Sequence, residues 1–239
     1  MRRNSKGTSS ADEFLLEKIA KVESHDSERV IAALEPFVTD KRREKLLEII
    51  GQRIGSVAVL FDSPYDPHNG AAIIRSCDAF GVQALHVVER KTTPFLAAMS
   101  VARGSEKWID IHRYKAPEDA VSHFASEGFT LVSADANGEL EPKDLGAIPK
   151  LTLVLGNEHD GVSAALRSAS GARVRIPMRG FAESLNVSVS AAILLAYATQ
   201  GRAADLAEKN RRKLYARGLY LSLQHADEII AAHADSERV

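Results

Sequence analysis

The 239 residues are enough to bury a real core, and 45% hydrophobic with 26% charged residues is the composition of an ordinary globular protein. The single cysteine excludes an internal disulfide framework and fits a reducing compartment such as the cytoplasm, and the eight histidines form no metal-binding motif. The net charge of -1 excludes a global attraction to nucleic acid, so any such binding has to come from local patches.

The first 55 residues predict an N-terminal helical extension. Residues 12–22, 27–37 and 40–53 each carry apolar side chains at helical spacing, and Thr39 stands before the third segment as its N-cap. Cations crowd the first turns of this third segment, where the helix dipole disfavours them. They are Lys41, Arg42, Arg43 and Lys45. The cluster is therefore either held for a polyanion such as RNA or is a solvated face.

From residue 56 to residue 200, segments of strand and helix character alternate. Strands are expected over residues 57–61, 84–88, 108–112, 130–134, 151–155 and 174–176, and helices over 70–80 and 116–128. Alternation of this kind predicts an α/β domain with a mostly parallel sheet and helices on both faces. Ligands of such sheets gather at the carboxyl ends of the strands.

The last two expected strands end in polar turns that lie close together in the sequence. The first stops at Gly156, where a missing Cβ allows a sharp turn, and the second is ended by Pro177, which cannot donate to a strand ladder. Ser184 or Asn186 then caps an apolar helix over residues 187–200. Two such turns in succession predict the active-site half of an enzyme, and the alternative is a pair of ordinary loops.

The loop after the first expected strand, residues 62–69, lacks the G-x-G-x-x-G pattern of a dinucleotide site. It leads instead into a helix in which Arg75 stands among small and apolar neighbours. Arg75 is either a structural ion-pair partner of Asp78 or Asp66, or a bidentate fork for a phosphate. Cys77 is expected to be a small core residue, since no histidine lies near it in sequence.

Residues 201–239 predict a C-terminal helical extension, with helices over 202–216 and 219–232. The first of these helices carries a basic cluster that offers a second local patch for RNA. The candidate contacts are Lys209, Arg211, Arg212 and Lys213. The preceding helix, 187–200, has no charge but is too rich in Ser, Thr and Gln for a membrane span, so burial in protein is expected and no membrane partner.

Three segments together resemble one family. They read N-G-A-A-I-I-R-S-C-D-A-F-G (69–81), L-V-L-G-N-E-H-D-G (153–161) and I-P-M-R-G-F-A-E-S-L-N-V-S (176–188). In this order and spacing they are similar to the RNA ribose 2'-O-methyltransferases of the SPOUT class, specifically the TrmH type. The resemblance implies a C-terminal deep trefoil knot, S-adenosylmethionine as cofactor, a tRNA substrate, a homodimer and no metal.

The resemblance also implies site residues. Those that it places at the reaction are Arg75, Asn69, Glu158, Ser184 and Asn186. The cofactor would meet the backbone around Ser133, Leu155, Gly156, Ile176 and Leu185. Arg75 of one subunit would complete the active site of the other. It is either the proton acceptor, which is awkward because arginine normally keeps its proton, or a phosphate clamp.

The expected reaction is methylation of a D-loop guanosine, at tRNA position 18. A ribosomal RNA enzyme of the same class is the nearest alternative, but such relatives usually carry a separate N-terminal RNA-binding domain, for which the first 55 residues are too few. A non-catalytic RNA-binding module would be expected to lose Asn69, Arg75 or Asn186, and all three are present. The alternative of a metabolic α/β enzyme that uses another nucleotide leaves the two basic clusters without an explanation.

Overall fold

A computed structural model describes residues 10–89, 104–157 and 159–236 of the chain. Contacts divide the chain into two compact units, one containing Ile54–Ala203 and the other joining Ser10–Arg53 to Ala204–Val239. Each unit is described by itself below. Within the described ranges no helix is long and apolar enough to cross a membrane.

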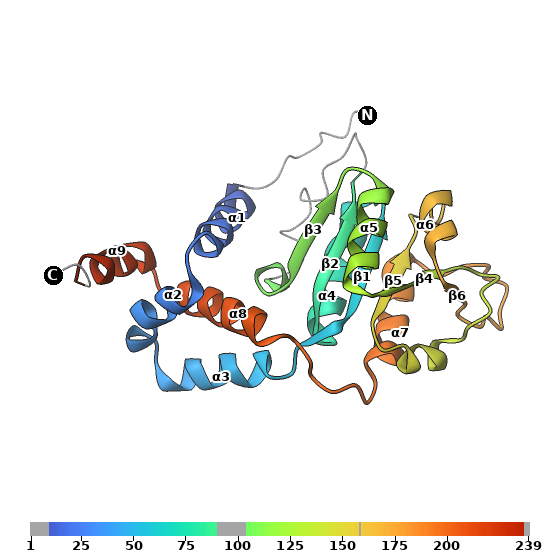
Figure 1. Ribbon diagram of the computed structural model, residues 1–239. Helices are drawn as coiled ribbons and strands as arrows, with labels where there is room; N and C mark the ends of the chain where they lie inside the picture. Colours follow the sequence, from blue (N-terminus) through green and yellow to red (C-terminus); the bar gives the residue numbers. More distant parts are fainter. Residues whose placement is uncertain (1–9, 90–103, 158, 237–239) are drawn as a thin grey trace. The chain divides into compact units, whose positions relative to one another are not determined.

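The unit Ile54–Ala203 is built on a six-stranded sheet with the order β3-β2-β1-β5-β4-β6 (Figure 1). Its strands are β1 Ile54–Asp62, β2 Val82–Val88, β3 Asp110–Tyr114, β4 Thr130–Ala134, β5 Leu151–Leu155 and β6 Ala172–Val174. Every neighbouring pair is parallel, which confirms the sheet expected from the sequence. The central strands β1 and β5 run in register, with Phe61 opposite Leu155.

Helices cover both faces of this sheet, as predicted (Figure 1). Val57, Val59 and Phe61 of β1 pack in one core with α4 (Pro67–Ala79) and α7 (Val187–Thr199). The alternate residues Ala58 and Leu60 pack in a second core with α5 (Pro117–Glu127) and α6 (Ala164–Ala169). Short 3-10 turns, η3 (Ser105–Lys107) and η4 (Pro142–Ala147), complete the connections. Successive side chains of β1 thus point to opposite faces of the sheet, and each face is covered by its own layer of helices.

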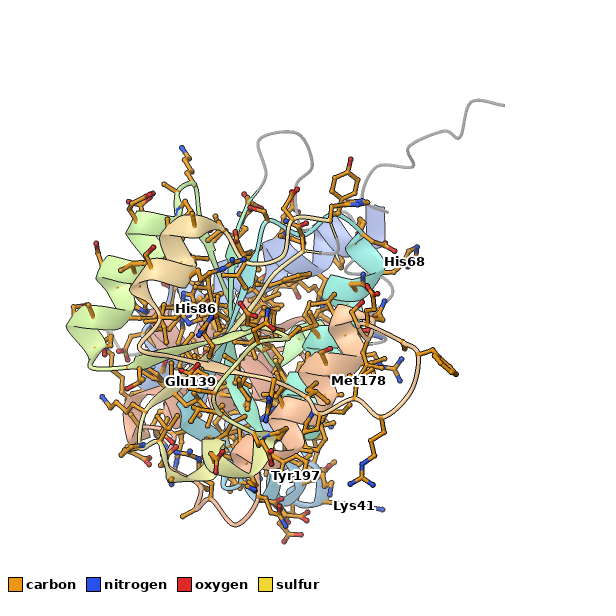
Figure 2. All side chains as sticks on the ribbon, turned by 90° about the vertical axis from the view of Figure 1, so that its right-hand side faces the viewer. Lys41, His68, His86, Glu139, Met178 and Tyr197 are labelled. Carbon is orange, nitrogen blue, oxygen red and sulfur yellow. The ribbon has the colours of Figure 1, made fainter. Side chains whose placement is uncertain are left out.

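His86 of β2 is the most deeply buried histidine of the second core (Figure 2). Its ring stacks on that of His112 of β3, with centroids 4.6 Å apart, and its Nδ1 lies 2.9 Å from the hydroxyl of Tyr114. Burial, reinforced by the neighbouring His112 and His123, lowers the pKa of His86 to about 2. The imidazole is therefore neutral throughout the physiological range.

Several elements of this unit have other boundaries than predicted: β1 and β2 begin three and two residues earlier, and α4, β3 and β6 differ as follows. Helix α4 starts three residues before residue 70, because Asp66 accepts a hydrogen bond from the His68 amide at 2.9 Å and Pro67 suits the first helical position. β3 lies two residues later than predicted. β6 ends at Val174, and Pro177 does not terminate it; beyond Val174 the backbone pairs with the loop after β4, where the Arg175 amide donates to the Leu140 carbonyl.

The carboxyl end of α7 is fixed by one side chain, that of Arg202. Its Nε donates to the Ala198 carbonyl at 3.0 Å, and its Nη1 and Nη2 donate to the carbonyls of Pro149 and Ile148, each at 2.8 Å. These bonds join the last turn of α7 to the chain segment that enters β5. They hold in place the helix whose other end forms part of the site described below.

The second unit is helical. Its N-terminal part comprises α1 Ser10–Glu23, α2 Ser27–Leu34, the short turn η1 Glu35–Phe37 and α3 Asp40–Ile50, which confirms the predicted helices. Thr39 is the N-cap residue of α3, although its side chain makes no capping hydrogen bond. The core of the unit contains Val30, Leu34 and Leu46 from these helices.

The C-terminal helices of this unit, α8 Glu208–Tyr220 and α9 Ala226–Ser236, differ from the predicted 202–216 and 219–232. Residues 202–207 are not helical, because the amides of Asp205 and Leu206 donate to the Arg53 carbonyl instead of entering a helix. Leu219 belongs to α8, and a turn separates it from α9. Apolar spacing alone did not reveal these two breaks.

Candidate active site

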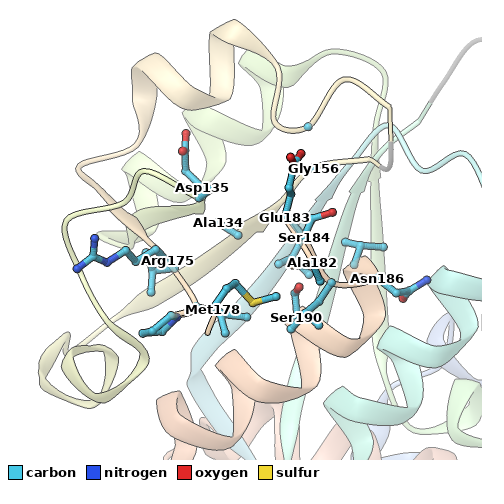
Figure 3. A pocket seen from close by; sticks show the side chains of 18 of the residues that line it. Ala134, Asp135, Gly156, Arg175, Met178, Ala182, Glu183, Ser184, Asn186 and Ser190 are labelled. Carbon is cyan, nitrogen blue, oxygen red and sulfur yellow. The ribbon is translucent and has the colours of Figure 1, made fainter. Parts of the chain in front are cut away.

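A pocket of about 900 Å³ lies at the carboxyl ends of β4, β5 and β6 (Figure 3). Its walls come from residues 134–136 after β4, the turn that follows β5, residues 174–178 after β6, and the segment 182–190 that leads into α7. The carboxyl edge of a parallel sheet is where ligands are expected. The two polar turns singled out in the sequence therefore meet in one cavity, as the active-site interpretation requires.

The turn after β5 is compact, and Gly156 makes this possible. A Cβ atom at this position would lie 2.1 Å from the Gly161 carbonyl carbon and 2.3 Å from the Val162 nitrogen, so no other residue fits without moving the backbone. Asn157 closes the turn, because its Oδ1 accepts the amides of His159 and Asp160 at 2.9 and 2.8 Å. Main-chain groups of this wall are thereby held close to the cavity.

Asn186 joins this pocket to helix α4. Its Oδ1 accepts the Ser188 amide at 2.8 Å and so caps α7, and its Nδ2 donates to Asn69 Oδ1 at 3.0 Å. The capping assignment falls on Asn186 and not on Ser184, the other candidate. Ser184 is exposed and lines the pocket. Ser184 and Asn186 thus line the cavity, and the buried Asn69 is tied to it through Asn186 without lining it itself.

The predicted cofactor residues mostly line the pocket. Leu155, Gly156, Ile176 and Leu185 do so, whereas Ser133 does not. Ser133 follows Val132, which packs in the α4 and α7 core, so its side chain belongs to the opposite, α5 and α6, side of the sheet.

Three charged residues of the lining were missed by the sequence reasoning: Asp135, Arg175 and Glu183 (Figure 3). Asp135 directly follows β4, so the rule that ligands lie at strand ends was a signal that pointed to it. Arg175 and Glu183 had no such signal, because their place depends on how the segment after β6 folds back. Asp135 and Glu183 give the lining two carboxylates, whereas the guanidinium of Arg175 points away from the other labelled residues and lies 3.8 Å from Glu141.

Arg75 lies outside this pocket. It is exposed on α4 and is absent from the cavity lining of its own chain. Among the described residues it makes no ion pair with Asp66 or Asp78, so the structural alternative for this arginine finds no support. Glu158, the remaining residue that the resemblance places at the reaction, lies outside the described residues.

Two of the four members of the basic cluster of α8 are paired with carboxylates within the helical unit. Arg212 binds both carboxylate oxygens of Glu28, and this hydrogen-bonded pairing lowers the pKa of Glu28. Lys213 Nζ lies 3.4 Å from an oxygen of Glu23. Arg211 is half-buried, whereas Lys209 is exposed and has no partner in the described part of the chain.

The cluster of α3 is paired in a similar way but is more exposed. Arg43 binds Asp40, Lys45 Nζ lies 2.9 Å from Glu48, and Arg42 Nε donates to Ser222 Oγ at 3.1 Å. Lys41 is exposed, with no ion pair to any described residue. Most of these charges therefore have an intramolecular role, and Lys41 and Lys209 are the members best placed for an external anion.

The pocket combines main-chain groups, two amide side chains and a few charges, which suits binding and orientation of a polar ligand. Within the described residues no group of three or more His, Cys, Asp or Glu side chains is arranged to hold a metal ion.

Comparison with known proteins gives consistent matches. The SpoU rRNA methylase family matches residues 56–196. A tRNA (guanosine(18)-2'-O)-methyltransferase of Aquifex aeolicus is 32% identical over 170 residues, covering 71% of this chain and 81% of the relative. The enzyme of the same name from Borreliella burgdorferi is 29% identical over 166 residues, covering 69% and 76%.

Solved structures match in the same way. The crystal structure of an A. aeolicus TrmH/SpoU tRNA modifying enzyme aligns with a TM-score of 0.69 and 29% identity, covering 77% of this chain and 98% of the other. An AdoMet-bound rRNA methyltransferase from Sinorhizobium meliloti aligns with a TM-score of 0.57 and 31% identity, covering 66% and 61%. The family match over residues 56–196 includes the strands and turns that build the pocket.

Proposed function

Because the chain belongs to the SpoU rRNA methylase family, we propose that it transfers a methyl group from S-adenosylmethionine to the ribose 2'-hydroxyl of guanosine 18 in the D-loop of tRNA. The observation that carries this proposal is the hydrogen bond between Asn186 and Asn69. It connects the pocket at the carboxyl ends of the strands to α4, the helix that presents Arg75. A hydrogen bond thus connects the pocket proposed for the cofactor to the helix that carries Arg75.

The pocket fits S-adenosylmethionine in size and in charge. A cavity of about 900 Å³ is large enough for a nucleoside cofactor. The cofactor carries an ammonium and a sulfonium, and the lining offers two carboxylates, Asp135 and Glu183, that can oppose these positive charges. The turn at Gly156 and the backbone at Ile176 and Leu185 supply main-chain donors and acceptors for the adenine and ribose.

The bound cofactor supplies a methyl group that its sulfonium has already activated. The residues of this chain have to hold the ribose hydroxyl in line with that group and help remove its proton. Asn69 is buried behind Asn186 and restrains it, so the amide of Asn186 is a fixed hydrogen-bonding group at the edge of the pocket. Ser184 is exposed in the lining, which supports a role for its hydroxyl as a hydrogen-bond partner of the ribose.

Arg75 contributes as a phosphate clamp in this proposal. Its guanidinium matches a phosphate bidentately and stabilises the charge beside the reacting hydroxyl. The proton then leaves to another group or to water, since an arginine keeps its own proton at neutral pH. This role requires Arg75 to reach a phosphate next to the target ribose.

We propose further that the active site is completed across a homodimer. Helix α7 is apolar all round, and Val189 and Tyr197 remain 46% and 44% exposed on it. An apolar helix normally buries its whole surface, so a second copy of the chain is the partner expected there. Because α4 packs beside α7, such an interface brings the exposed Arg75 of one subunit towards the pocket of the other.

The deep trefoil knot is also part of the proposal. β6 lies at the edge of the sheet beyond β4, whereas α7 packs beneath β1 and β5. The connection over residues 175–186 therefore has to return across the carboxyl ends of β4 and β5. In the knotted arrangement it passes through the loop that precedes β5, and the Arg202 bonds lock the helix that follows.

Two observations favour tRNA over ribosomal RNA. This chain covers 98% of the A. aeolicus tRNA modifying enzyme but 61% of the S. meliloti rRNA methyltransferase. The relatives with the tRNA name are matched over 76% and 81% of their length. We place the reaction in the cytoplasm, where tRNA is modified.

Transfer of a labelled methyl group to unmodified tRNA and, separately, to ribosomal RNA tests this function. We expect label on the 2'-oxygen of guanosine 18 of tRNA. Label on ribosomal RNA alone would support the proposed reaction but show that the substrate is ribosomal RNA and not tRNA. Cofactor binding without any transfer would point to another RNA substrate or a missing partner, whereas absence of both transfer and cofactor binding would favour a non-catalytic RNA-binding role.

A further inference from the structure

Two exposed aromatic rings meet where the loops after the central strands approach each other. Tyr65 lies in the loop after β1 and His159 in the turn after β5, and their ring centroids are 4.6 Å apart with an interplanar angle of 77°. Tyr65 is 54% exposed, and His159 is exposed as well. The reaction proposed above gives neither ring a role.

The two loops that carry these rings are fixed to each other. Asp62, the last residue of β1, is buried, and its Oδ2 accepts the Ser163 amide at 2.7 Å across the two loops. Its Oδ1 accepts the Ser63 hydroxyl at 2.9 Å. On the other side Asn157 binds the His159 amide. The rings are therefore held in place before any ligand binds, which lowers the ordering cost of binding.

The ring pair lies between the two parts of the site. His159 is flanked by Asn157 and Gly161, which both line the pocket. Tyr65 directly precedes Asp66, the N-cap of α4, and Asn69 follows in the first turn of that helix. A nucleotide whose ribose reaches Asn69 and the pocket thus brings its base or a neighbouring base towards these rings.

We propose that Tyr65 and His159 form a stacking platform for a base of the RNA substrate, at or next to the methylated nucleotide. Proteins that act on single nucleotides take the base out of its stack and rest it on aromatic faces. An edge-to-face pair uses only one face of one ring, so a ring face remains for the base. This inference rests on the proposed function, because it assigns a contact to the same RNA substrate.

Variants at Tyr65 separate stacking from simple loop packing. Tyr65→Phe keeps the ring, whereas Tyr65→Leu keeps apolar bulk but removes the flat face. We expect Tyr65→Leu to raise KM for tRNA about 5- to 150-fold, the range for loss of one base–aromatic stack, with an unchanged Kd for S-adenosylmethionine and an unchanged Tm. Tyr65→Phe should behave as the wild type.

A binding measurement gives a second readout. With 2-aminopurine in place of guanosine 18, stacking on the platform should quench its fluorescence in the wild type and in Tyr65→Phe, and less so in Tyr65→Leu. An unchanged KM in Tyr65→Leu, or a defect of equal size in Tyr65→Phe, would overturn the platform while leaving the methyltransferase intact. Absence of transfer by the wild type would overturn the proposed function and this inference together.

Discussion

The side-chain amide of Asn186 donates a hydrogen bond of 3.0 Å to the side-chain carbonyl of Asn69, 117 positions earlier in the chain. The same Asn186 caps α7 through its Oδ1, so one side chain sets both the start of that helix and the orientation of Asn69 on α4. Two substitutions of Asn186 separate these two roles, because one removes only the donor to Asn69 and the other also removes the acceptor that caps α7.

Asn186→Asp keeps the capping acceptor but removes the donor to Asn69. We expect kcat/KM to fall by about one to two orders of magnitude, because Asn69 no longer holds the side chain at position 186 that orients the ribose, while Tm stays close to that of the wild type. Asn186→Ala should lose the same activity and also about 1 kcal/mol of helix capping. Turnover and thermal unfolding measure the two effects. Wild-type turnover in Asn186→Asp would remove this hydrogen bond from the mechanism.

Gly156→Ala should abolish cofactor binding. The added Cβ would lie 2.1 Å from the backbone of Gly161, so the turn that walls the pocket has to shift. Gly180→Ala is the matched control, because no atom lies within 4 Å of a Cβ at that position. Equilibrium dialysis with S-adenosylmethionine distinguishes them. Equal affinity in the two variants would mean that the turn does not contact the cofactor.

Arg75→Ala should abolish methyl transfer without changing cofactor affinity or Tm, because Arg75 is exposed and lies outside the pocket of its own chain. The dimer proposal adds a mixing test. Co-expressed Arg75→Ala and Gly156→Ala chains form mixed dimers with one intact site each, so about a quarter of wild-type activity should return. Two inactive variants that remain inactive together would place Arg75 and the pocket in the same subunit.

Much of the fold was predictable because its signals are local. The apolar runs 57–61 and 151–155 predicted two of the strands, and Asn186 stood among the predicted caps. The parts that were predicted wrongly depend on partners far away in sequence. The end of β6 depends on a hydrogen bond to Leu140, and the late start of α8 depends on amides that bind the Arg53 carbonyl.

In the candidate site, too, the residues with local sequence signals were predicted and those that depend on distant partners were not. Gly156 and the polar residues near it were visible as turn signals, whereas Glu183 and Arg175 enter the pocket only through the return of the segment after β6. Arg212 looked like an RNA contact because its partner Glu28 lies 184 positions away. A sequence shows which side chains are charged, but the ion pairs formed in the folded chain decide which of these side chains are available to a ligand.

Lys209→Ala and Arg212→Ala should therefore have different effects. Lys209 is exposed without a described partner, so its loss should weaken RNA binding and reduce the slope of log K against log salt by about 0.7 to 0.9. Arg212 is already bound to Glu28, so Arg212→Ala should change this slope less. Filter binding at several salt concentrations measures both. A larger slope change in Arg212→Ala would mean that its ion pair breaks when RNA binds.

Stability should fall in mild acid because of His86. Burial, then the neighbouring His112 and His123, lowers its pKa from 6.5 to about 2 in the folded chain. Below pH 6.5 the unfolded chain therefore takes up a proton that the folded chain does not, so the free energy of unfolding decreases as the pH falls. At pH 5 this contribution approaches about 2 kcal/mol.

Urea unfolding at pH 7 and pH 5 measures this contribution. Carboxylates also titrate in this interval, so the comparison is between variants and not between pH values alone. His86→Gln should lose stability at pH 7, since the core is disturbed, but it should lose less than the wild type on going to pH 5. The control His225→Gln changes an exposed histidine and should keep the wild-type dependence. An identical decrease in His86→Gln and the wild type would contradict the lowered pKa of His86 in the folded chain.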